Sequence, residues 1–362
     1  MQKSFDSIER ARINWHSQCL RVRYGEKVWR LGIDAGFTCP HRSVDRLHGG
    51  CRFCASDGNV SAYQKSQAFK SKTSVPNTIN ANVDASNHID DGSTIEQQIR
   101  RALAFTQRRY KAKAFFLYFQ AYTCTNAPVP MLARIYDNAI ATFERLYYDA
   151  QKQAGVDLQL SNLSKTPLKG IIVSTRPDCF DIAKAELLAS YRKQGFEVWV
   201  EFGLQSMHEE TLALINRGHG IDEFLNAMDI AKKAQLSRTV HLILGLPGES
   251  HGSMIETAKF VAQIKPEGLK YHDLHLVKGS AFARSFCSGE IALMHPSRLP
   301  ALLADCLELM PASTEIMRLS ADFRHDETIN LHPQVDKHKL ARAVEEELAV
   351  RDSFQGQRFE FD

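Results

Sequence analysis

Six short apolar runs, each preceding a segment with the pattern of an amphipathic helix, constrain the fold of this chain more than any other feature. The runs are continuous rather than alternating, which is typical of strands buried on both faces in a parallel sheet. They cover residues 28–36, 114–122, 170–176, 197–205, 239–246 and 269–277. The intervening helices are expected at residues 94–109, 129–152, 182–194, 208–216, 222–234 and 250–264.

Alternating strands and helices predict an α/β fold built from βα units. Six units suit a partial (β/α)6 barrel, and a doubly wound open sheet is the alternative. Residues 57–92 are rich in Ser, Asn and Asp, so a flexible insertion is expected there. Residues 335–349 predict a charged C-terminal helix that docks weakly or extends. We expect an N-terminal extension over 1–26, a core barrel over 27–280 and a partly helical C-terminal extension over 281–362.

The composition is that of an ordinary globular protein, with 44% hydrophobic and 24% charged residues among 362. A net charge of +3 permits an anionic partner without requiring one. The N-terminus has no signal-peptide core, and no apolar run is long enough to cross a membrane, so a cytoplasmic location is expected. Thiols stay reduced there, and the eight cysteines are therefore interpreted as metal ligands, reactive thiols or packing residues rather than disulfides.

Three cysteines, Cys39, Cys51 and Cys54, lie in the stretch GFTCPHRSVDRLHGGCRFC, directly after the first strand-like run. Three thiolates on one loop can bind three irons of a cubane cluster and leave the fourth iron open to a substrate or cofactor. Structural clusters normally use four cysteines. The pattern therefore favours a cluster that takes part in chemistry over one that only stabilises the fold.

A zinc site is the alternative for the same loop. Cys3His is a common zinc ligand set, and His16, His41 or His48 could complete it. Gly49 and Gly50 would let the backbone approach either kind of centre closely. The spacing of the cysteines alone does not decide between iron–sulfur and zinc.

The cysteine stretch is the first of six stretches that occur in order, one at or beside each expected strand end, and together span about residues 25–320. They are GFTCP…GGCRFC, YFQAYT, STRPDC, VEFGLQSMHEETLALINRGH, HLILGLPGE and LHLVKGS, with a weaker match in MRLSAD at 317–322. In these stretches the chain resembles the radical S-adenosylmethionine (SAM) superfamily, most closely its YhcC-type branch. More distantly, the cysteine motif and INRGH are similar to the radical SAM domain of the elongator catalytic subunit. The acetyltransferase-like segment that follows there has no counterpart in this chain.

The resemblance implies a radical SAM barrel with a [4Fe-4S] cluster on Cys39, Cys51 and Cys54. It implies that SAM binds the free iron and that an electron from the cluster cleaves SAM to methionine and a 5′-deoxyadenosyl radical. A low-potential electron donor of the flavodoxin or ferredoxin type is implied as a partner. The substrate is not indicated, and RNA is one possibility.

The resemblance also suggests cofactor-binding residues near the strand ends. Arg176 would pair with the SAM carboxylate, and Glu201 would accept from the ribose hydroxyls. Gly245 would let the adenine approach the backbone. The full expected set is Gln120, Ser174, Arg176, Glu201, Gln205, Arg217, Gly245 and Leu276. For most of these positions a structural role, such as ending a strand or filling the core, is the plainer alternative.

Four residues are candidates for contact with the substrate or for proton transfer: His219, His275, Lys278 and Cys179. A histidine on a strand more often bonds to its neighbours than acts in catalysis, and Cys179 has a buried packing role as its alternative. Cys19, Cys287 and Cys306 lack metal-ligand spacing and are expected to be packing residues.

One basic segment lies at residues 100–114, RRALAFTQRRYKAKA. It would suit an RNA backbone, but it is more often the solvated face of a helix. As a function of another class, a non-catalytic binding module stabilised by zinc or by an iron–sulfur cluster is also consistent with the cysteine loop.

Overall fold

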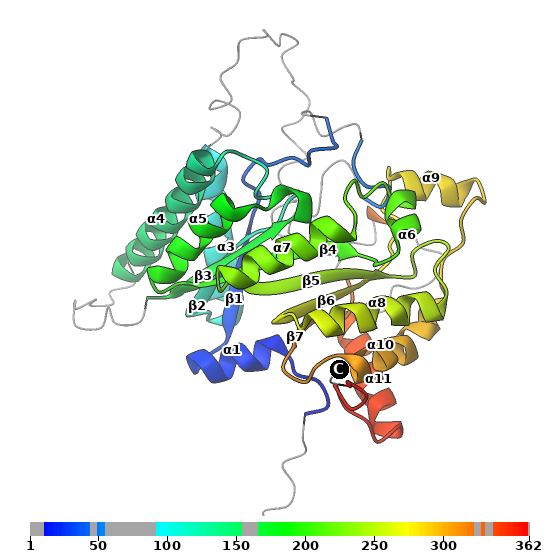
Figure 1. Cartoon of the computed structure of the whole chain (residues 1–362). Coiled ribbons are helices and arrows are strands. Elements are labelled where there is room, and N and C mark those ends of the chain that lie inside the picture. The colour runs from blue at the N-terminus through cyan, green and yellow to red at the C-terminus, as the bar shows by residue number, and fades with distance from the viewer. Residues whose placement is uncertain are drawn as a thin grey trace, which may run out of the picture.

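Seven parallel strands form one curved sheet whose spatial order follows the order of the sequence, β1 to β7 (Figure 1). The computed structural model describes residues 11–43, 49–54, 92–153, 166–321, 327–329 and 336–360. The strands are β1 Val28–Ile33, β2 Ala114–Phe119, β3 Leu168–Thr175, β4 Glu197–Gln205, β5 Ser237–Leu244, β6 Gly268–Asp273 and β7 Glu315–Arg318. The predicted partial barrel is confirmed.

The consecutive strand order excludes the doubly wound alternative, in which the order reverses at a switch point. β7 is one strand more than the sequence predicted, and it pairs with β6 through Gly268↔Glu315 and Lys270↔Arg318. β1 and β7 are the two edges of the sheet and do not pair with each other. The fold is therefore a half-barrel with one open seam.

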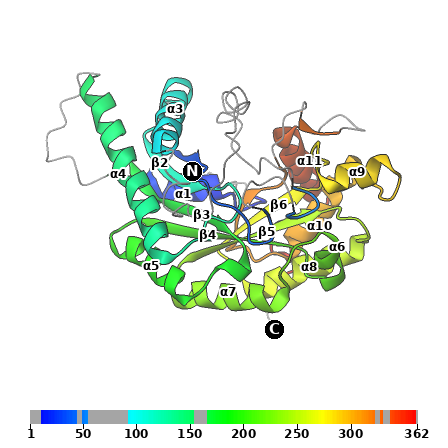
Figure 2. The same ribbon diagram turned by 90° about the horizontal axis from the view of Figure 1, so that it is seen from above.

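Helices lie along the outer, convex side of the sheet, as the view from above shows (Figure 2). They connect consecutive strands and are α3 Gly92–Tyr110, α4 Val129–Gln153, α5 Ile182–Lys193, α6 Glu209–Leu214, α7 Ile221–Lys233 and α8 His251–Ile264. All six are close to the predicted ranges. Apart from Gly92, which begins α3, the predicted insertion 57–92 lies outside the described residues.

The strands divide their side chains between two faces, because successive residues point to opposite sides. Along β2, Phe115, Leu117 and Phe119 belong to the large core beneath the outer helices, whereas Phe116 and Tyr118 belong to a smaller inner cluster. This division explains the continuous apolar runs: the outer face is fully covered, and the inner face is partly filled.

The two ends of the described chain meet at the N-terminal ends of the strands. The helix α1, His16–Tyr24, contributes Leu20 to the inner cluster. The backbone N–H of Ile316 in β7 donates to Asn14 O at 2.8 Å, and that of Gln355 donates to Arg12 O at 2.9 Å. Segments about 300 residues apart in sequence are thus joined at one end of the half-barrel.

The C-terminal helix α11, Lys337–Val350, packs beside α10, Leu299–Leu309. Leu340, Val344 and Leu348 of α11 are at most 1% exposed and belong to the large core. The expectation of a weakly docked helix is therefore wrong. Its many charges hid a narrow apolar stripe at four-residue spacing, which is enough to bury one face of a helix.

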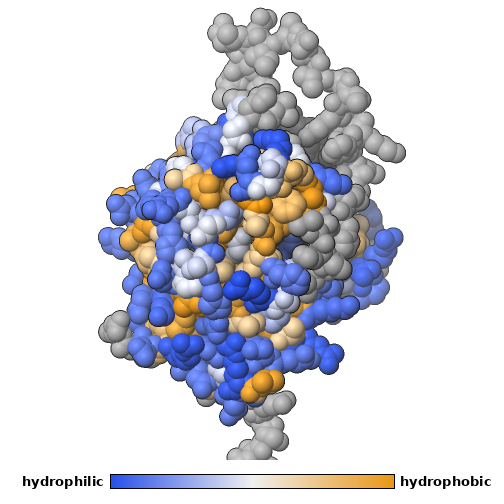
Figure 3. Space-filling model, turned by 90° about the vertical axis from the view of Figure 1, so that its right-hand side faces the viewer, coloured by the Kyte–Doolittle hydropathy of each residue, from blue (hydrophilic) through white to orange (hydrophobic). Residues whose placement is uncertain are grey.

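The surface agrees with the ordinary composition of the chain. The face in Figure 3 is mostly hydrophilic, with smaller apolar patches between the polar residues. No helix within the described ranges is both long and apolar enough to pass through a membrane.

The docking of α11 leads to a stability prediction with a matched control. Val344→Ala should lower the free energy of unfolding by about 2 kcal/mol, because it leaves a small cavity in the core. Val350, in the same helix, is 86% exposed, so Val350→Ala should have little effect. Urea unfolding followed by tryptophan fluorescence compares the two variants. Equal stability of both would show that α11 does not contribute to the core.

Candidate functional site

The three cysteines lie on the loop that follows β1, in a turn stabilised by backbone hydrogen bonds. The Arg42 N–H donates to Cys39 O at 3.0 Å, and the Cys54 N–H donates to Cys51 O at 3.0 Å. Gly50 has a φ of +83°, and a Cβ there would lie 2.4 Å from the Arg42 guanidinium. The left-handed backbone favours glycine at this position, and a Cβ there would also displace the Arg42 guanidinium.

The loop is bound to the barrel on two sides. The Asn216 side-chain amide donates to Gly50 O at 2.8 Å, and the Arg52 N–H donates to Ile215 O at 2.9 Å. On the other side the Phe282 N–H, in α9 Ala281–Cys287, donates to Arg52 O at 2.9 Å. The position of the cysteines is thus fixed by segments that follow β4 and β6.

Two of the sulfurs accept hydrogen bonds from barrel residues. The Thr123 hydroxyl donates to Cys39 Sγ at 3.2 Å, and Arg217 donates to Cys51 Sγ at 3.3 Å. A hydrogen bond from the Cys54 thiol, supported by the positive charge of Arg217, holds the pKa of Cys51 well below its usual value. A thiolate is the form that binds metal, so these residues fit an iron–sulfur ligand set.

No group of three His, Cys, Asp or Glu side chains in the described ranges is close enough to hold a metal ion as it stands. The fit therefore rests on the chemistry of the sulfurs and not on a formed coordination sphere. For the zinc alternative, His16 is excluded: it bonds to Glu315 at 2.5 Å and contacts the Trp199 ring, at the opposite ends of the strands. His41 contacts Cys51 Sγ at 3.6 Å, and His48 lies outside the described residues.

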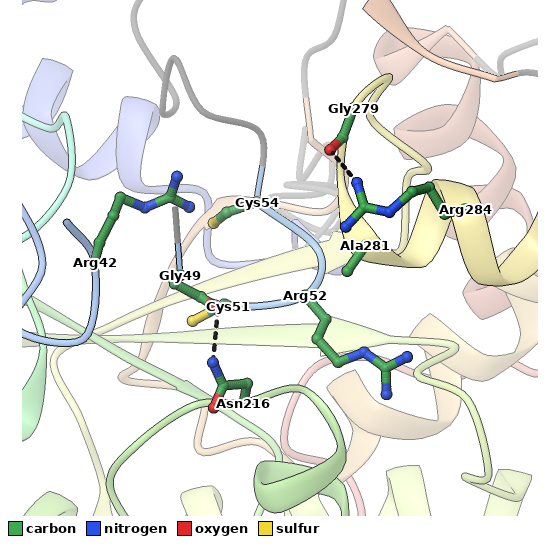
Figure 4. Close-up of a pocket in the computed structure, with 10 residues that line it drawn as sticks. Arg42, Gly49, Cys51, Arg52, Cys54, Asn216, Gly279, Ala281 and Arg284 are labelled. Carbon is green, nitrogen blue, oxygen red and sulfur yellow. Dashed lines mark hydrogen bonds between the residues drawn. The ribbon is translucent and has the colours of Figure 1, made fainter. Parts of the chain in front are cut away.

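A pocket of about 330 Å³ borders Cys51 and Cys54 (Figure 4). Three arginines, Arg42, Arg52 and Arg284, are among its lining residues, and its described lining includes no carboxylate. The pocket therefore favours anionic groups next to the two sulfurs. Its lining is Arg42, Gly49, Gly50, Cys51, Arg52, Cys54, Asn216, Gly279, Ala281 and Arg284.

Arg176 and Arg217, two of the expected cofactor-binding residues, lie against the cysteine loop. Arg176 contacts His41 Nδ1 at 2.6 Å and donates to both carboxylate oxygens of Asp178, at 2.9 and 2.8 Å. Arg217 donates to Gly203 O from two nitrogens, in addition to its bond to Cys51. Both guanidinium groups are buried and already paired within the chain.

His219 lies beside Arg217 and contacts the same Gly203 carbonyl at 3.2 Å. Burial, together with the charge of Arg217, lowers the pKa of His219 to about 4. The imidazole is therefore neutral at pH 7. Cys179, in the 3-10 turn Pro177–Cys179, is buried, and burial raises its pKa to about 11. Its thiol is protonated and lies near Cys39.

Glu201 and Ser174 belong to a buried polar network on the inner face of the half-barrel. The carboxylate of Glu201 accepts from the Tyr118 hydroxyl at 2.7 Å and from the Ser174 hydroxyl at 2.8 Å. It also contacts His241 Nε2 at 3.0 Å and Lys270 Nζ at 2.5 Å. The positive charge of Lys270 holds the pKa of Glu201 well below its usual value, although burial opposes this.

The other expected cofactor-binding residues lie at the C-terminal ends of the strands. Gln205 ends β4 with a φ of +80°, a strained conformation for a residue with a side chain. Gly245 has a φ of +80°, and its N–H donates to Met254 Sδ at 3.1 Å. Leu276 is buried in an apolar cluster after β6, and Gln120 is partly exposed just after β2.

The two remaining catalytic candidates are His275 and Lys278. Neither contacts the cysteines in the described part of the chain. His275 Nε2 lies 3.2 Å from Asp273 in an ion-pair geometry. The Lys278 side chain is exposed, and its backbone N–H donates to Glu327 O at 2.8 Å. Among the cysteines expected to pack, Cys306 is fully buried and Cys19 is half-buried, but Cys287 is exposed at the end of α9, so a packing role is wrong for it.

Sequence reasoning did not identify several residues of the inner face: Arg30, Tyr118, His241, Lys270 and Arg318. They occupy inward positions in strands that are otherwise apolar, where a polar residue every second position is the available signal. The arginines of the basic segment 100–114 lie on α3, where Arg100 pairs with Glu96 at 2.7 Å, while Ile99 and Leu103 face the core. Lys111 and Lys113 follow the helix and are exposed. Contact with RNA stays a prediction.

Comparison with known protein families identifies the family of this chain. The family described as "Radical SAM superfamily" matches residues 39–261, beginning at Cys39, and the family described as "Radical_SAM C-terminal domain" matches residues 266–349. The chain belongs to the radical SAM superfamily. Members of this superfamily are in general enzymes.

Two relatives match nearly the whole radical SAM chain. YtqA from Bacillus subtilis is 29% identical over 348 residues, covering 96% of this chain and 92% of its own length. YhcC from Escherichia coli K12 is 31% identical over 312 residues, covering 86% of this chain and 84% of its own length. The predicted resemblance to the YhcC-type branch is confirmed.

A solved structure with the same fold is the archaeal Elp3 from Methanocaldococcus infernus. It aligns with a TM-score of 0.59 at 18% identity and covers 72% of this chain and 60% of that one. The more distant resemblance to the elongator subunit is confirmed at the level of the fold.

The buried histidines of this radical SAM chain predict acid sensitivity. Burial lowers the pKa of His241 to about 4, below the value of 6.5 in the unfolded chain. Between pH 6.5 and pH 4 the unfolded chain therefore binds a proton at this histidine that the folded chain does not. As the pH is lowered through this range, the free energy of unfolding decreases by about 3 kcal/mol because of His241.

His241→Gln should reduce this loss, because its amide can still donate to Glu201 but does not titrate. His338→Gln, at an exposed histidine, should follow the wild type. Urea unfolding at pH 7, 6, 5 and 4 measures the effect. Parallel pH curves for wild type and His241→Gln would contradict the assignment of a neutral, buried His241.

Proposed function

We propose that this chain binds a [4Fe-4S] cluster through Cys39, Cys51 and Cys54 and cleaves SAM reductively to methionine and a 5′-deoxyadenosyl radical that acts on a further substrate. The observation that carries the proposal is the cysteine loop at the strand ends, in which Cys51 is stabilised as a thiolate and which begins the radical SAM match. When bound, the cluster supplies the electron for this cleavage, while the protein supplies orientation and exclusion of water.

The chain's own residues would position the cofactors. Arg217 holds Cys51 and the Gly203 carbonyl together, which supports a role in fixing the cysteine loop against β4. Arg176 is the candidate for the SAM carboxylate, and its present partner, Asp178, would then share or yield the guanidinium. The planar fork of an arginine fits two carboxylate oxygens.

A residue of β4 is proposed to bind the ribose of SAM. The resemblance suggests Glu201 for this role, but the Glu201 carboxylate already contacts residues of β2, β3, β5 and β6. Gln205, at the end of the same strand, has a side-chain amide with no hydrogen-bond partner in the described part of the chain and is better placed to meet a ribose. Gly245 and Leu276 remain the proposed adenine contacts.

The electron donor would be a low-potential, acidic protein of the flavodoxin or ferredoxin type in the cytoplasm. The pocket beside Cys51 and Cys54 supports this proposal, because three arginines surround it. Complementary charge speeds and orients such encounters.

The decisive experiment compares Cys51→Ala with Cys287→Ala in anaerobically reconstituted protein. Cys287 is exposed and distant in sequence from the loop, so its variant should bind iron and sulfide and form 5′-deoxyadenosine from SAM after reduction with dithionite. Cys51→Ala should lose the cluster and form at least about a hundredfold less deoxyadenosine, because a ligand of the metal centre is removed.

Normal iron and sulfide content in Cys51→Ala would exclude the ligand assignment. A wild-type protein that binds zinc, or whose cluster gives the same paramagnetic resonance spectrum with and without SAM, would favour the non-catalytic binding module instead.

A further inference from the structure

The inner face of the half-barrel carries more positive than negative charge midway along the strands. Three basic side chains point into it: Arg30 of β1, Lys270 of β6 and Arg318 of β7. Burial lowers the pKa of Lys270 to about 7, so the two arginines supply most of the positive charge. Lys270 and Arg318 are direct register partners. The Arg30 guanidinium lies 5.9 Å, and the Lys270 ammonium 4.6 Å, from the centre of the Tyr118 ring. Two cations thus lie against the same phenol.

The carboxylates near these cations are already in use. Glu201 contacts Lys270, His241, Tyr118 and Ser174. Glu315 is bound at the N-terminal end of the strands by His16 and by Arg23, at 2.5 and 2.7 Å. Glu201 therefore forms its ion pair with Lys270, and Glu315, whose charge also acts on Arg30, is already bound by His16 and Arg23.

Arg30 and Arg318 make no hydrogen bond or ion pair with any described residue, and both are partly exposed. They come from the two edge strands and lie close enough across the open seam to interact electrostatically. A third group lacks a partner: the Nε2 atom of His272, on β6, is buried without a hydrogen bond. A buried polar atom without a partner, such as His272 Nε2, is uncommon in a folded protein and needs an explanation.

The neighbouring histidines do not add to the charge. Burial and the nearby cations lower the pKa of His241 to about 4 and keep that of His272 well below its usual value, so both are neutral at pH 7. A neutral imidazole can donate one hydrogen bond without requiring a counter-ion. The inner face is therefore positively charged at the seam, and the neutral imidazole of His272 beside it can donate a hydrogen bond.

We propose that the seam of the half-barrel binds an anionic group of the substrate, a phosphate or a carboxylate, between Arg30 and Arg318, with Lys270 and His272 beside it. Guanidinium groups bind both kinds of anion through two parallel hydrogen bonds. The inference rests on the proposed function in taking the inner face as the substrate chamber, and it narrows the substrate to a molecule with an anionic group.

The test is a titration of cluster-loaded, full-length protein with inorganic phosphate, and separately with acetate, by calorimetry at constant ionic strength. Wild type should bind at least one of the two anions saturably, and the tighter one identifies the group. Arg30→Gln and Arg318→Gln should each weaken that binding about tenfold, because each removes a charge-assisted hydrogen bond. Arg318→Lys should retain most of it. Arg134→Gln, an exposed arginine on α4, should bind as wild type.

Absence of saturable binding of either anion to wild type, or unchanged affinity in both glutamine variants, would overturn the proposal. Competition between SAM and the bound anion would also overturn it, because the arginines would then serve the cofactor. Deoxyadenosine formation is measured on the same samples. Anion binding that depends on the two arginines, without formation of deoxyadenosine, would support the anion site and contradict the proposed function. The two hypotheses can therefore fail separately.

Discussion

A carboxylate buried at the centre of a parallel half-barrel has to be balanced by neighbouring groups, and this requirement organises the inner face. Glu201 receives contacts from Tyr118, Ser174, His241 and Lys270, which belong to four other strands. These contacts add directional constraints to the apolar packing of the outer face. Removing one partner of a buried ion pair typically costs about 3–5 kcal/mol, so the network specifies the register of the five central strands.

The parallel arrangement has a second effect, since it brings the C-terminal ends of all strands to one edge. The cysteine loop is fixed there by residues that follow β4 and β6, and Arg217 joins the sulfur of Cys51 to the backbone of Gly203. A loop that ordinarily would be variable is thereby held at both sides. The rigidity of the site comes from the barrel and not from the loop's own sequence.

The sequence predicted the half-barrel and the cysteine loop because both leave local signals: continuous apolar runs and close spacing of one residue type. It did not predict β7, whose four residues are too few to form a recognisable run. The inner network was missed for another reason. His241 and Lys270 each look like a single interruption of an apolar strand, and their partner Glu201 is distant in sequence. Only the register of the sheet brings them together.

The joining of the two chain ends at the base of the half-barrel has a consequence for synthesis. Asn14 and Arg12 find their backbone partners at Ile316 and Gln355, which are synthesised about 300 residues later. Long-range contacts of this kind slow folding and extend the time for which apolar surface is exposed. Docking of α1 against β7 therefore has to wait for a segment about 300 residues further along the chain, and the lower end of the inner face cannot close before that segment has been made.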